Sequence, residues 1–198
     1  MKKTIPLALF LLSFAGLSQA ATVDYLQSRN GVAYQVNQEK PFSGTYVQKY
    51  ENGQKAIDVT FKGGKENGVA TEWYASGEKR GEAHYLDGKT NGLMTKWYEN
   101  GQKSFETTYK NDMKNGVTTE WYRNGQKSEE ATFKKGKENG VSTEWYVNGQ
   151  KREVANFTNG KNSDGVMTGW YENGKKALEV TFKDGQEVSR QYWTVDAA

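Results

Sequence analysis

The sequence has no cysteine, one histidine and only two prolines among its 198 residues. The lack of cysteine excludes disulfides, thiolate metal sites and the acylated cysteine of a lipoprotein. The lone histidine, His84, cannot build a histidine metal site by itself. With 22 glycines and 13% aromatic residues, the low proline content is typical of many short strands joined by tight turns.

Long hydrophobic runs are also scarce, since hydrophobic residues make up 35% of the chain and the mean hydropathy is −0.92. The one clear run covers residues 5–17, behind Lys2 and Lys3 and before the small-x-small site at residues 18–20. Such a run is short for a membrane span but typical of a secretory leader. We therefore predict a cleaved signal peptide over residues 1–20, export to the periplasm or medium, and no integral membrane segment after cleavage.

The chain also has no large excess of positive or negative charge. The chain has 27 basic and 24 acidic residues, and removal of Lys2 and Lys3 leaves 25 − 24, a net charge of +1. A chain so close to neutral lacks the basic field that nucleic-acid binders use. We expect no nucleic-acid partner.

What the chain has in abundance is a repeat. Glycines recur every 24 residues, with one 25-residue step at the end, and each is taken as position 1 of a repeat. These glycines are Gly44, Gly68, Gly92, Gly116, Gly140 and Gly165. Tyrosine recurs at position 7, glycine at 10, lysine at 12 and an aromatic residue at 18, while tryptophan fills position 6 in all repeats but the first. The aromatic residues that form the candidate partner-binding set are Trp73, Trp97, Trp121, Trp145, Trp170, Tyr74, Tyr98, Tyr122 and Tyr146.

Each repeat has the pattern of a β-hairpin. The Asn-Gly pair at positions 9 and 10 predicts a two-residue type I′ turn between strands at positions 2–8 and 11–18. A second glycine-bearing turn near position 21 leads into the next repeat. No connection is long enough for a crossover helix, so we predict an all-β fold, an elongated single-layer antiparallel meander of six stacked hairpins.

Two-residue turns also predict the strand register. Position 7 is expected opposite position 12, and position 6 opposite 13. Lysine at position 12 is then expected to face position 5 of the next repeat. The predicted pairs are Lys55 with Glu72, Lys103 with Glu120, and Lys127 with Glu144.

The predicted organisation follows from these limits. After the leader, residues 21–43 form an N-terminal cap, with a turn at Asn30-Gly31 and an alternating strand at residues 32–36. The six repeats span 44–67, 68–91, 92–115, 116–139, 140–164 and 165–187. Residues 188–198 form a C-terminal cap and tail.

The repeat unit, Gly-x4-Trp-Tyr-x-Asn-Gly-x-Lys-x5-Phe-Lys-x-Gly-Lys, resembles the MORN-repeat variant in its bacterial form, often described as an antitoxin component. The lead-in from Pro41 to Gly44 is similar to the way those arrays open. The resemblance covers about residues 30–187. It implies stacked β-hairpins, a binding role, and no catalysis.

Nothing in the pattern indicates an enzyme. Carboxylates such as Glu72, Glu120 and Glu144 recur with the repeat, as solvated or cross-strand paired residues do, and His84 stands where other repeats have threonine. No nucleophile motif or phosphate loop is present. We expect no catalytic residue, no metal site and no cofactor.

Two interpretations of the aromatic rows remain open. In the first, the rings pack repeat against repeat and supply the core that the few aliphatic residues cannot. In the second, one row is exposed and binds a partner, as Trp and Tyr often do at interfaces.

Three functions follow from these interpretations: an envelope protein-binding module, in its most specific form an immunity or antitoxin-like protein that sequesters an effector or toxin; a cell-wall or glycan-binding module; and a passive structural repeat protein. The expected partner is a protein, with a glycan as the alternative.

Overall fold

The computed structural model describes residues 20, 21 and 26–194. Apart from Ala20, the predicted signal peptide lies outside these residues. The chain forms two compact parts, an N-terminal half ending at Gly92 and a C-terminal half beginning at Leu93. No helix in the described part of the chain is long and apolar enough to cross a membrane.

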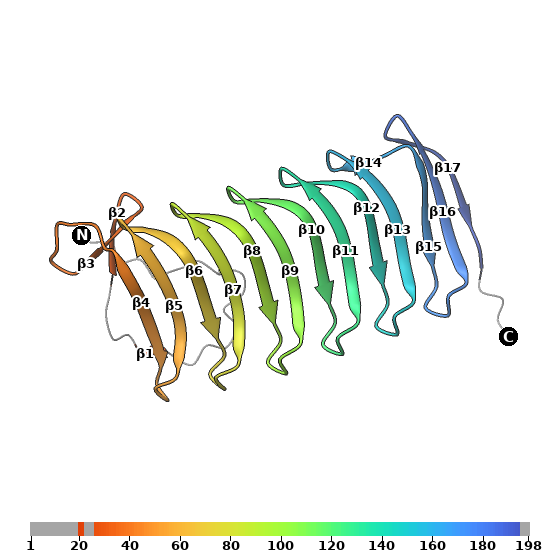
Figure 1. Ribbon diagram of the computed structural model, residues 1–198. Helices are drawn as coiled ribbons and strands as arrows, with labels where there is room; N and C mark the ends of the chain where they lie inside the picture. Colours follow the sequence, from red (N-terminus) through yellow and green to blue (C-terminus); the bar gives the residue numbers. More distant parts are fainter. Residues whose placement is uncertain (1–19, 22–25, 195–198) are drawn as a thin grey trace. The chain divides into compact units, whose positions relative to one another are not determined.

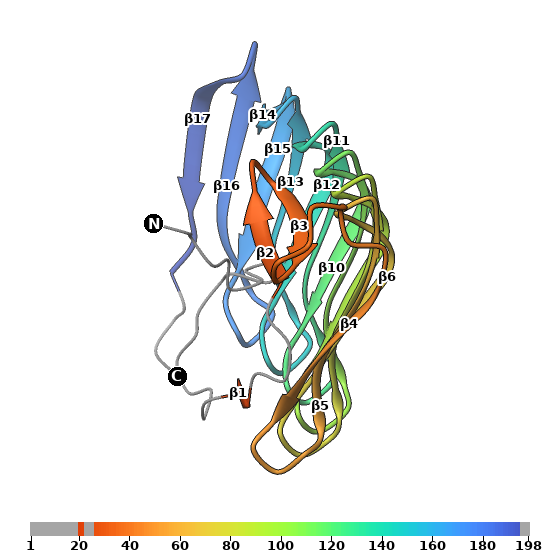
Figure 2. The same cartoon turned by 90° about the vertical axis from the view of Figure 1, so that its left-hand side faces the viewer.

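The N-terminal half carries an antiparallel sheet in the order β1-β4-β5-β6-β7, with the hairpin β2–β3 outside it. Figure 2 shows this hairpin as a separate pair of strands, in orange-red. The strands are β1 (Ala20–Ala21), β2 (Leu26–Arg29), β3 (Val32–Gln35), β4 (Gly44–Tyr50), β5 (Lys55–Lys62), β6 (Lys65–Trp73) and β7 (Lys79–Leu86). Strand β8 (Lys89–Trp97) contains the boundary between the two halves.

The C-terminal half continues in the same manner, in the order β9-β10-β11-β12-β13-β15-β16-β17, with β14 paired to β13. These strands lie side by side in chain order in Figure 1. They are β9 (Lys103–Lys110), β10 (Met113–Trp121), β11 (Lys127–Lys134), β12 (Lys137–Trp145), β13 (Lys151–Thr158), β14 (Lys161–Asn162), β15 (Gly165–Trp170), β16 (Lys176–Lys183) and β17 (Gln186–Tyr192). The predicted all-β antiparallel meander of hairpin repeats is confirmed.

The type I′ turn of each repeat does not lie at the Asn-Gly pair, where the sequence predicts it, but at the second turn. The true two-residue type I′ turn lies at positions 20 and 21, where both residues have positive φ, as at Lys135 (51°) and Gly136 (79°). At the Asn-Gly loop only glycine is left-handed, as in Gly125 (86°), so the prediction of a type I′ turn there is wrong. The amide of Gly125 donates to the carbonyl of Tyr122, and the amide of Tyr122 donates to the carbonyl of Gln126.

The longer loop shifts the register. Position 6 faces position 12, as in Trp121 opposite Lys127, and the residue at position 13 forms a bulge. A second irregularity follows the type I′ turn, where the glycine at position 1 adopts φ values near +127°, as in Gly116. Bulges of this kind insert residues without partners into one strand.

The predicted pairing of lysine 12 with position 5 is therefore wrong. Glu72 faces Ile57, Glu120 faces Phe105, and Glu144 faces Glu129. The lysines instead pair within their own strand. The bulge brings position 12 beside position 15, as in Lys55 with Asp58 at 2.8 Å, Lys103 with Glu106 at 2.5 Å, and Lys127 with Glu130.

The most buried side chains are small. They lie at positions 3 and 16, which face each other across neighbouring strands, as in Ala70 with Ala83 and Thr118 with Ala131. Thr118 also faces Thr107, and their hydroxyl oxygens are hydrogen-bonded at 2.6 Å. Aromatic rings are fully buried mainly in the N-terminal half, where Phe61 is an example. The core of the described residues is thus a central row of small residues with aromatic residues beside it, and not the aromatic rings alone, as the first interpretation has it.

The N-terminal cap docks on the first type I′ turn. Asn30 and Gly31 form the predicted turn of the β2–β3 hairpin, both with positive φ. The amide of Ala33 donates to the carbonyl of Gly64 at 2.8 Å. A Cβ on Gly64 would lie 2.2 Å from Cγ1 of Val32, so the cap needs glycine at this position.

Candidate functional site

The predicted tryptophans lie half-buried at strand ends, and Trp73, Trp121 and Trp145 each lie beside a lysine of the preceding repeat. The ammonium nitrogen of Lys103 is 5.8 Å from the ring centroid of Trp121, and that of Lys127 is 5.8 Å from Trp145. Cation–π contacts at this distance are weakly favourable at exposed sites. The lysine covers part of one ring face, so the tryptophan row joins one repeat to the next as well as facing solvent.

The predicted tyrosines serve the same joining role. Their hydroxyl groups donate to the carbonyl oxygen of the tryptophan one repeat ahead, at 2.6 Å for Tyr98, 2.7 Å for Tyr122 and 2.8 Å for Tyr146. A buried or half-buried tyrosine usually finds such a partner for its hydroxyl. The polar end of each of these rings is therefore occupied within the chain.

The asparagine of each Asn-Gly loop completes the connection. The amide nitrogen of Asn124 donates to the carbonyl of Val147 at 3.0 Å, while its carbonyl oxygen accepts from the amide of Gln126 at 3.1 Å. The sequence indicates only a turn role for this asparagine. Its bond to the next repeat had no sequence signal except its recurrence every 24 residues.

One row of exposed side chains was missed by the sequence analysis. Position 2 carries Leu93, Val117, Val141 and Val166, whose exposed fractions are 45%, 52%, 55% and 53%. Positions 2, 4 and 6 of one strand point to the same face of a sheet, so this row shares its face with the tryptophans. The signal was available, because an aliphatic residue stands four before each tryptophan.

We call this surface of the C-terminal half the tryptophan face. Its members are the aliphatic residues at position 2, the tryptophans at position 6, and the ion-paired lysines and glutamates at positions 12 and 15. The ion pairs are Lys103–Glu106, Lys127–Glu130 and Lys176–Glu179. Val117 faces Thr132, Thr119 faces Glu130 and Trp121 faces Lys127, so the acidic row lies between the aliphatic row and the tryptophan row.

The opposite face carries an acidic ladder, defined as Glu120, Glu129, Glu144 and Glu153. Each faces the next across neighbouring strands, from β10 to β13. Side chains directly opposite each other have Cβ atoms roughly 4.5–5.5 Å apart. Among the residues that the structure describes, the one salt bridge in this ladder joins Glu144 to Arg152 at 3.3 Å.

Burial and repulsion between like charges both raise pKa values in the acidic ladder. Burial, followed by the charges of Glu120, Glu144 and Glu138, raises the pKa of Glu129, and Lys114 opposes the shift. Burial and the charge of Glu144 likewise raise the pKa of Glu153.

Within the described residues, no group of three or more histidine, cysteine, aspartate or glutamate side chains is arranged to hold a metal ion. The remaining departures from the repeat are local. Asp112 occupies the second position of a type I′ turn with φ of 65°, and Ser163 bonds through its hydroxyl to that of Thr158 at 2.6 Å. His84 packs against Gly92, where a Cβ would lie 2.9 Å from that of the histidine.

Comparison with known families identifies the repeat. The model of the MORN repeat variant matches residues 66–87, 90–111, 114–135 and 163–184. The first three matches begin 24 residues apart, the same spacing as the hairpins. No curated protein matches the chain.

Proposed function

Because the chain carries tandem MORN-variant repeats, we propose that it is a non-catalytic binding module whose tryptophan face holds a protein partner. The observation that carries this proposal is the row Leu93, Val117, Val141 and Val166, each about half exposed. Exposed apolar and aromatic side chains that lie beside charged ones are typical of a protein interface. Repeated exposure of aliphatic residues along one face is otherwise an unfavourable use of apolar surface.

The proposal extends to the place and type of binding. A cleaved leader would put the module outside the cytoplasm, in the periplasm or medium. There it would act as an immunity-like protein that sequesters an effector or toxin, in line with the antitoxin description of the similar bacterial repeats. Rows of side chains repeated along neighbouring strands suit an extended partner segment.

A glycan ligand for the aromatic rows is the alternative. It is less favoured because sugars stack on open ring faces, whereas lysine ammonium groups lie over Trp121 and Trp145. The tyrosine hydroxyls that could bind sugar hydroxyls already donate to backbone carbonyls. The aliphatic row has no role in a stacked sugar complex.

Affinity purification of the tagged mature protein from its own envelope fraction tests this proposal. We expect wild type to recover one stoichiometric protein, and the double variant Val117→Lys/Val141→Lys to recover at least about tenfold less, since charge at an interface centre is strongly unfavourable. Both positions are about half exposed, so the fold should tolerate lysine.

Val147→Lys is the matched control, because Val147 is 52% exposed but lies in the loop after β12. It should recover the partner as wild type does. Undiminished recovery by the double variant would contradict the face assignment. Recovery of only wall fragments, lost on replacement of Trp97 and Trp121, would favour the glycan alternative.

A further inference from the structure

Two groups of lysines in the C-terminal half differ in their ion pairs. Those at position 12 that precede an acidic residue are ion-paired on the tryptophan face, as Lys127 is with Glu130. Those at the type I′ turn between β11 and β12 are different. Lys134, Lys135 and Lys137 are exposed, and no ion pair with a described residue involves them.

Lys135 stands in an unfavourable backbone conformation. Its φ is 51°, in the left-handed region that costs an ordinary side chain roughly 1–2 kcal/mol. The corresponding first turn position in the other repeats is Gly63, Asp87, Asn111, Asn159 or Asp184, the residue types that accept this conformation. A long cationic side chain kept at a strained position indicates a use for that charge.

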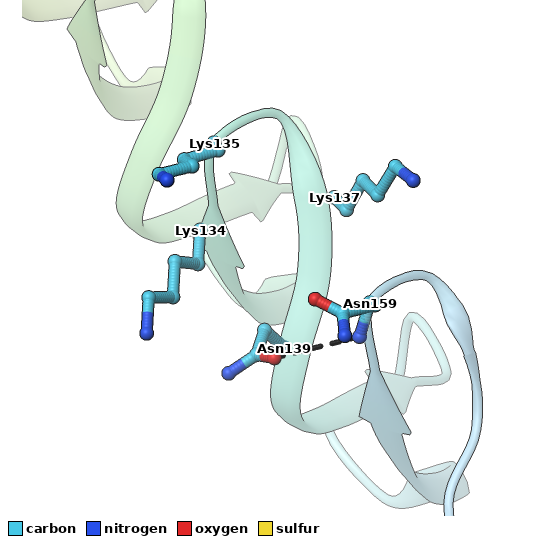
Figure 3. A pocket seen from close by; sticks show the side chains of 5 residues that line it. All are labelled: Lys134, Lys135, Lys137, Asn139 and Asn159. Carbon is cyan, nitrogen blue, oxygen red and sulfur yellow. Dashed lines mark hydrogen bonds between the residues drawn. The ribbon is translucent and has the colours of Figure 1, made fainter.

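The three lysines line a hollow. A cavity of about 470 Å³ is bordered by Lys134, Lys135, Lys137, Asn139 and Asn159, which we call the lysine edge. Figure 3 shows these side chains around the β11–β12 turn and the turn between β13 and β14, which carries Asn159. The amide of Asn159 donates to Oδ1 of Asn139 at 3.4 Å, so one end of the Asn139 side chain is held and its nitrogen points away from Asn159 (Figure 3).

A second hollow adjoins the first. It measures about 370 Å³ and is lined by Lys110, Asn111, Met113, Asn115 and Lys135. Lys135 borders both hollows, and equivalent turns lie two strands apart, a spacing of roughly 10 Å. The cations therefore follow the turn edge as a row, and a ligand with anionic groups spaced along its length could contact more than one.

We propose that the lysine edge binds an anionic carbohydrate through its sulfate or phosphate groups. Lysine ammonium groups are point-charge ligands for such anions. The two asparagine amides can donate to and accept from sugar hydroxyls between the charged groups. This site is separate from the tryptophan face. Its test does not depend on the outcome of the protein-binding proposal.

Other anionic ligands fit the two hollows less well. No aromatic ring lines either of them, so a nucleobase has no platform on which to stack. The larger one is lined only by lysine and asparagine, so an apolar side chain or lipid tail has no matching surface. No carboxylate lines either hollow to repel the anion.

The test is calorimetric titration of the mature chain with low-molecular-mass dextran sulfate, with unsulfated dextran as the uncharged probe. The variant Lys135→Asn installs the residue found at Asn111 and Asn159. We expect it to weaken binding by about tenfold, since charge-assisted hydrogen bonds are the strong ones. Its thermal midpoint should equal or exceed that of wild type, because the left-handed strain is relieved.

Lys151→Gln is the matched control. Lys151 is an exposed lysine at position 12 whose repeat has Val154 at position 15, so it also lacks an ion pair within the described residues. It should change affinity by less than about twofold. Equal losses of affinity in both variants would show that binding depends only on the overall charge of the chain, and this would contradict the proposed site. No binding by wild type, or equal binding of unsulfated dextran, would overturn it as well.

Discussion

The hydroxyl of Tyr122 lies 2.7 Å from the carbonyl oxygen of Trp145, one repeat ahead. This bond and the asparagine bond beside it recur along the C-terminal half, from Tyr98 and Asn100 to Tyr146 and Asn148. Each hairpin is too small to bury a core of its own, so stability must come from neighbouring repeats. At the residue scale, the tyrosines and asparagines are the side chains that join repeat to repeat.

Removing one hydroxyl should measure that contribution. Tyr122→Phe leaves the ring in place but leaves the Trp145 carbonyl without this donor. We expect a loss of about 1 kcal/mol in the free energy of unfolding, the usual net value of one hydrogen bond. Urea denaturation followed by tryptophan fluorescence measures this loss.

Tyr109→Phe is the control for that prediction. Tyr109 is half-buried and has no hydroxyl hydrogen bond within the described residues, and burial raises its pKa. Four other repeats carry phenylalanine at the same position. An effect of Tyr109→Phe as large as that of Tyr122→Phe would show that the hydroxyl bond to Trp145 is unimportant.

The residue types of these joining side chains were predictable, and their partners were not. Periodicity shows that Tyr122 recurs every repeat, but a 24-residue spacing does not say what its hydroxyl contacts. The same limit explains the aliphatic row. Val117 and Val141 resemble ordinary strand residues in the sequence, and only their exposed fractions distinguish them as surface residues.

At the scale of elements, the two turns decide the register of every strand. Asn-Gly is the strongest local signal for a type I′ turn, yet here it closes a longer loop because the asparagine side chain bonds to Gln126 and to the next repeat. The type I′ turns form instead at pairs such as Asn159-Gly160 and Lys135-Gly136. Local turn propensity alone could not place the bulges, since tertiary contacts select between the two turns.

The strand register places the glutamates of the acidic ladder opposite one another. The stability of the folded chain should therefore depend on pH. Glu129 and Glu153 have raised pKa values in the folded chain, so protonation favours folding. Their contribution to stability is full below the unfolded pKa of about 4.3 and is lost as the pH rises through the folded values. Glu120 on β10, Glu144 on β12 and the adjacent Glu138 strengthen the effect, while Lys114 and Arg152 weaken it.

Glu129→Gln tests the ladder. It removes a like charge directly opposite Glu120 and Glu144, and should raise the free energy of unfolding at pH 7.5 by roughly 0.5 kcal/mol. The gain should shrink as the pH falls towards 5. Thermal midpoints across this range give the comparison.

Glu130→Gln is the matched control, one residue along on the tryptophan face and paired with Lys127. It should lower stability slightly at pH 7.5, because it breaks an ion pair. If Glu129→Gln destabilised the chain at pH 7.5, or if both variants behaved alike, the ladder would not be a source of repulsion.

The last strand shows how the repeat ends. All seven residues of β17 are exposed, and its pairing within the described residues is with β16 alone. Arg190 stands opposite Val180, in the place that Ala70, Thr118 and Ser142 take opposite Val59, Thr107 and Ala131. It binds Glu187 and the hydroxyl of Tyr192. A large charged side chain at an edge strand opposes further strand pairing.

At the scale of the whole molecule, the sequence predicted the number and order of the hairpins. The six hairpin repeats, the turn at Asn30-Gly31 and the strand that follows this turn all correspond to described elements. Periodic patterns specify such features because every repeat gives the same signal. The proposed binding surface depends on which side chains the neighbouring residues leave exposed, and the strand register determines this.

The most direct test of the tryptophan face as a binding surface is site-specific photocrosslinking in the native cell. A photoreactive amino acid at Val141, in the exposed row, should yield one discrete crosslinked protein. The same probe at Val147, equally exposed but in the loop, should yield little of it. The account predicts a strong band at Val141 alone. Equal crosslinking at both positions, or none at Val141 in cells where the partner is present, would contradict it.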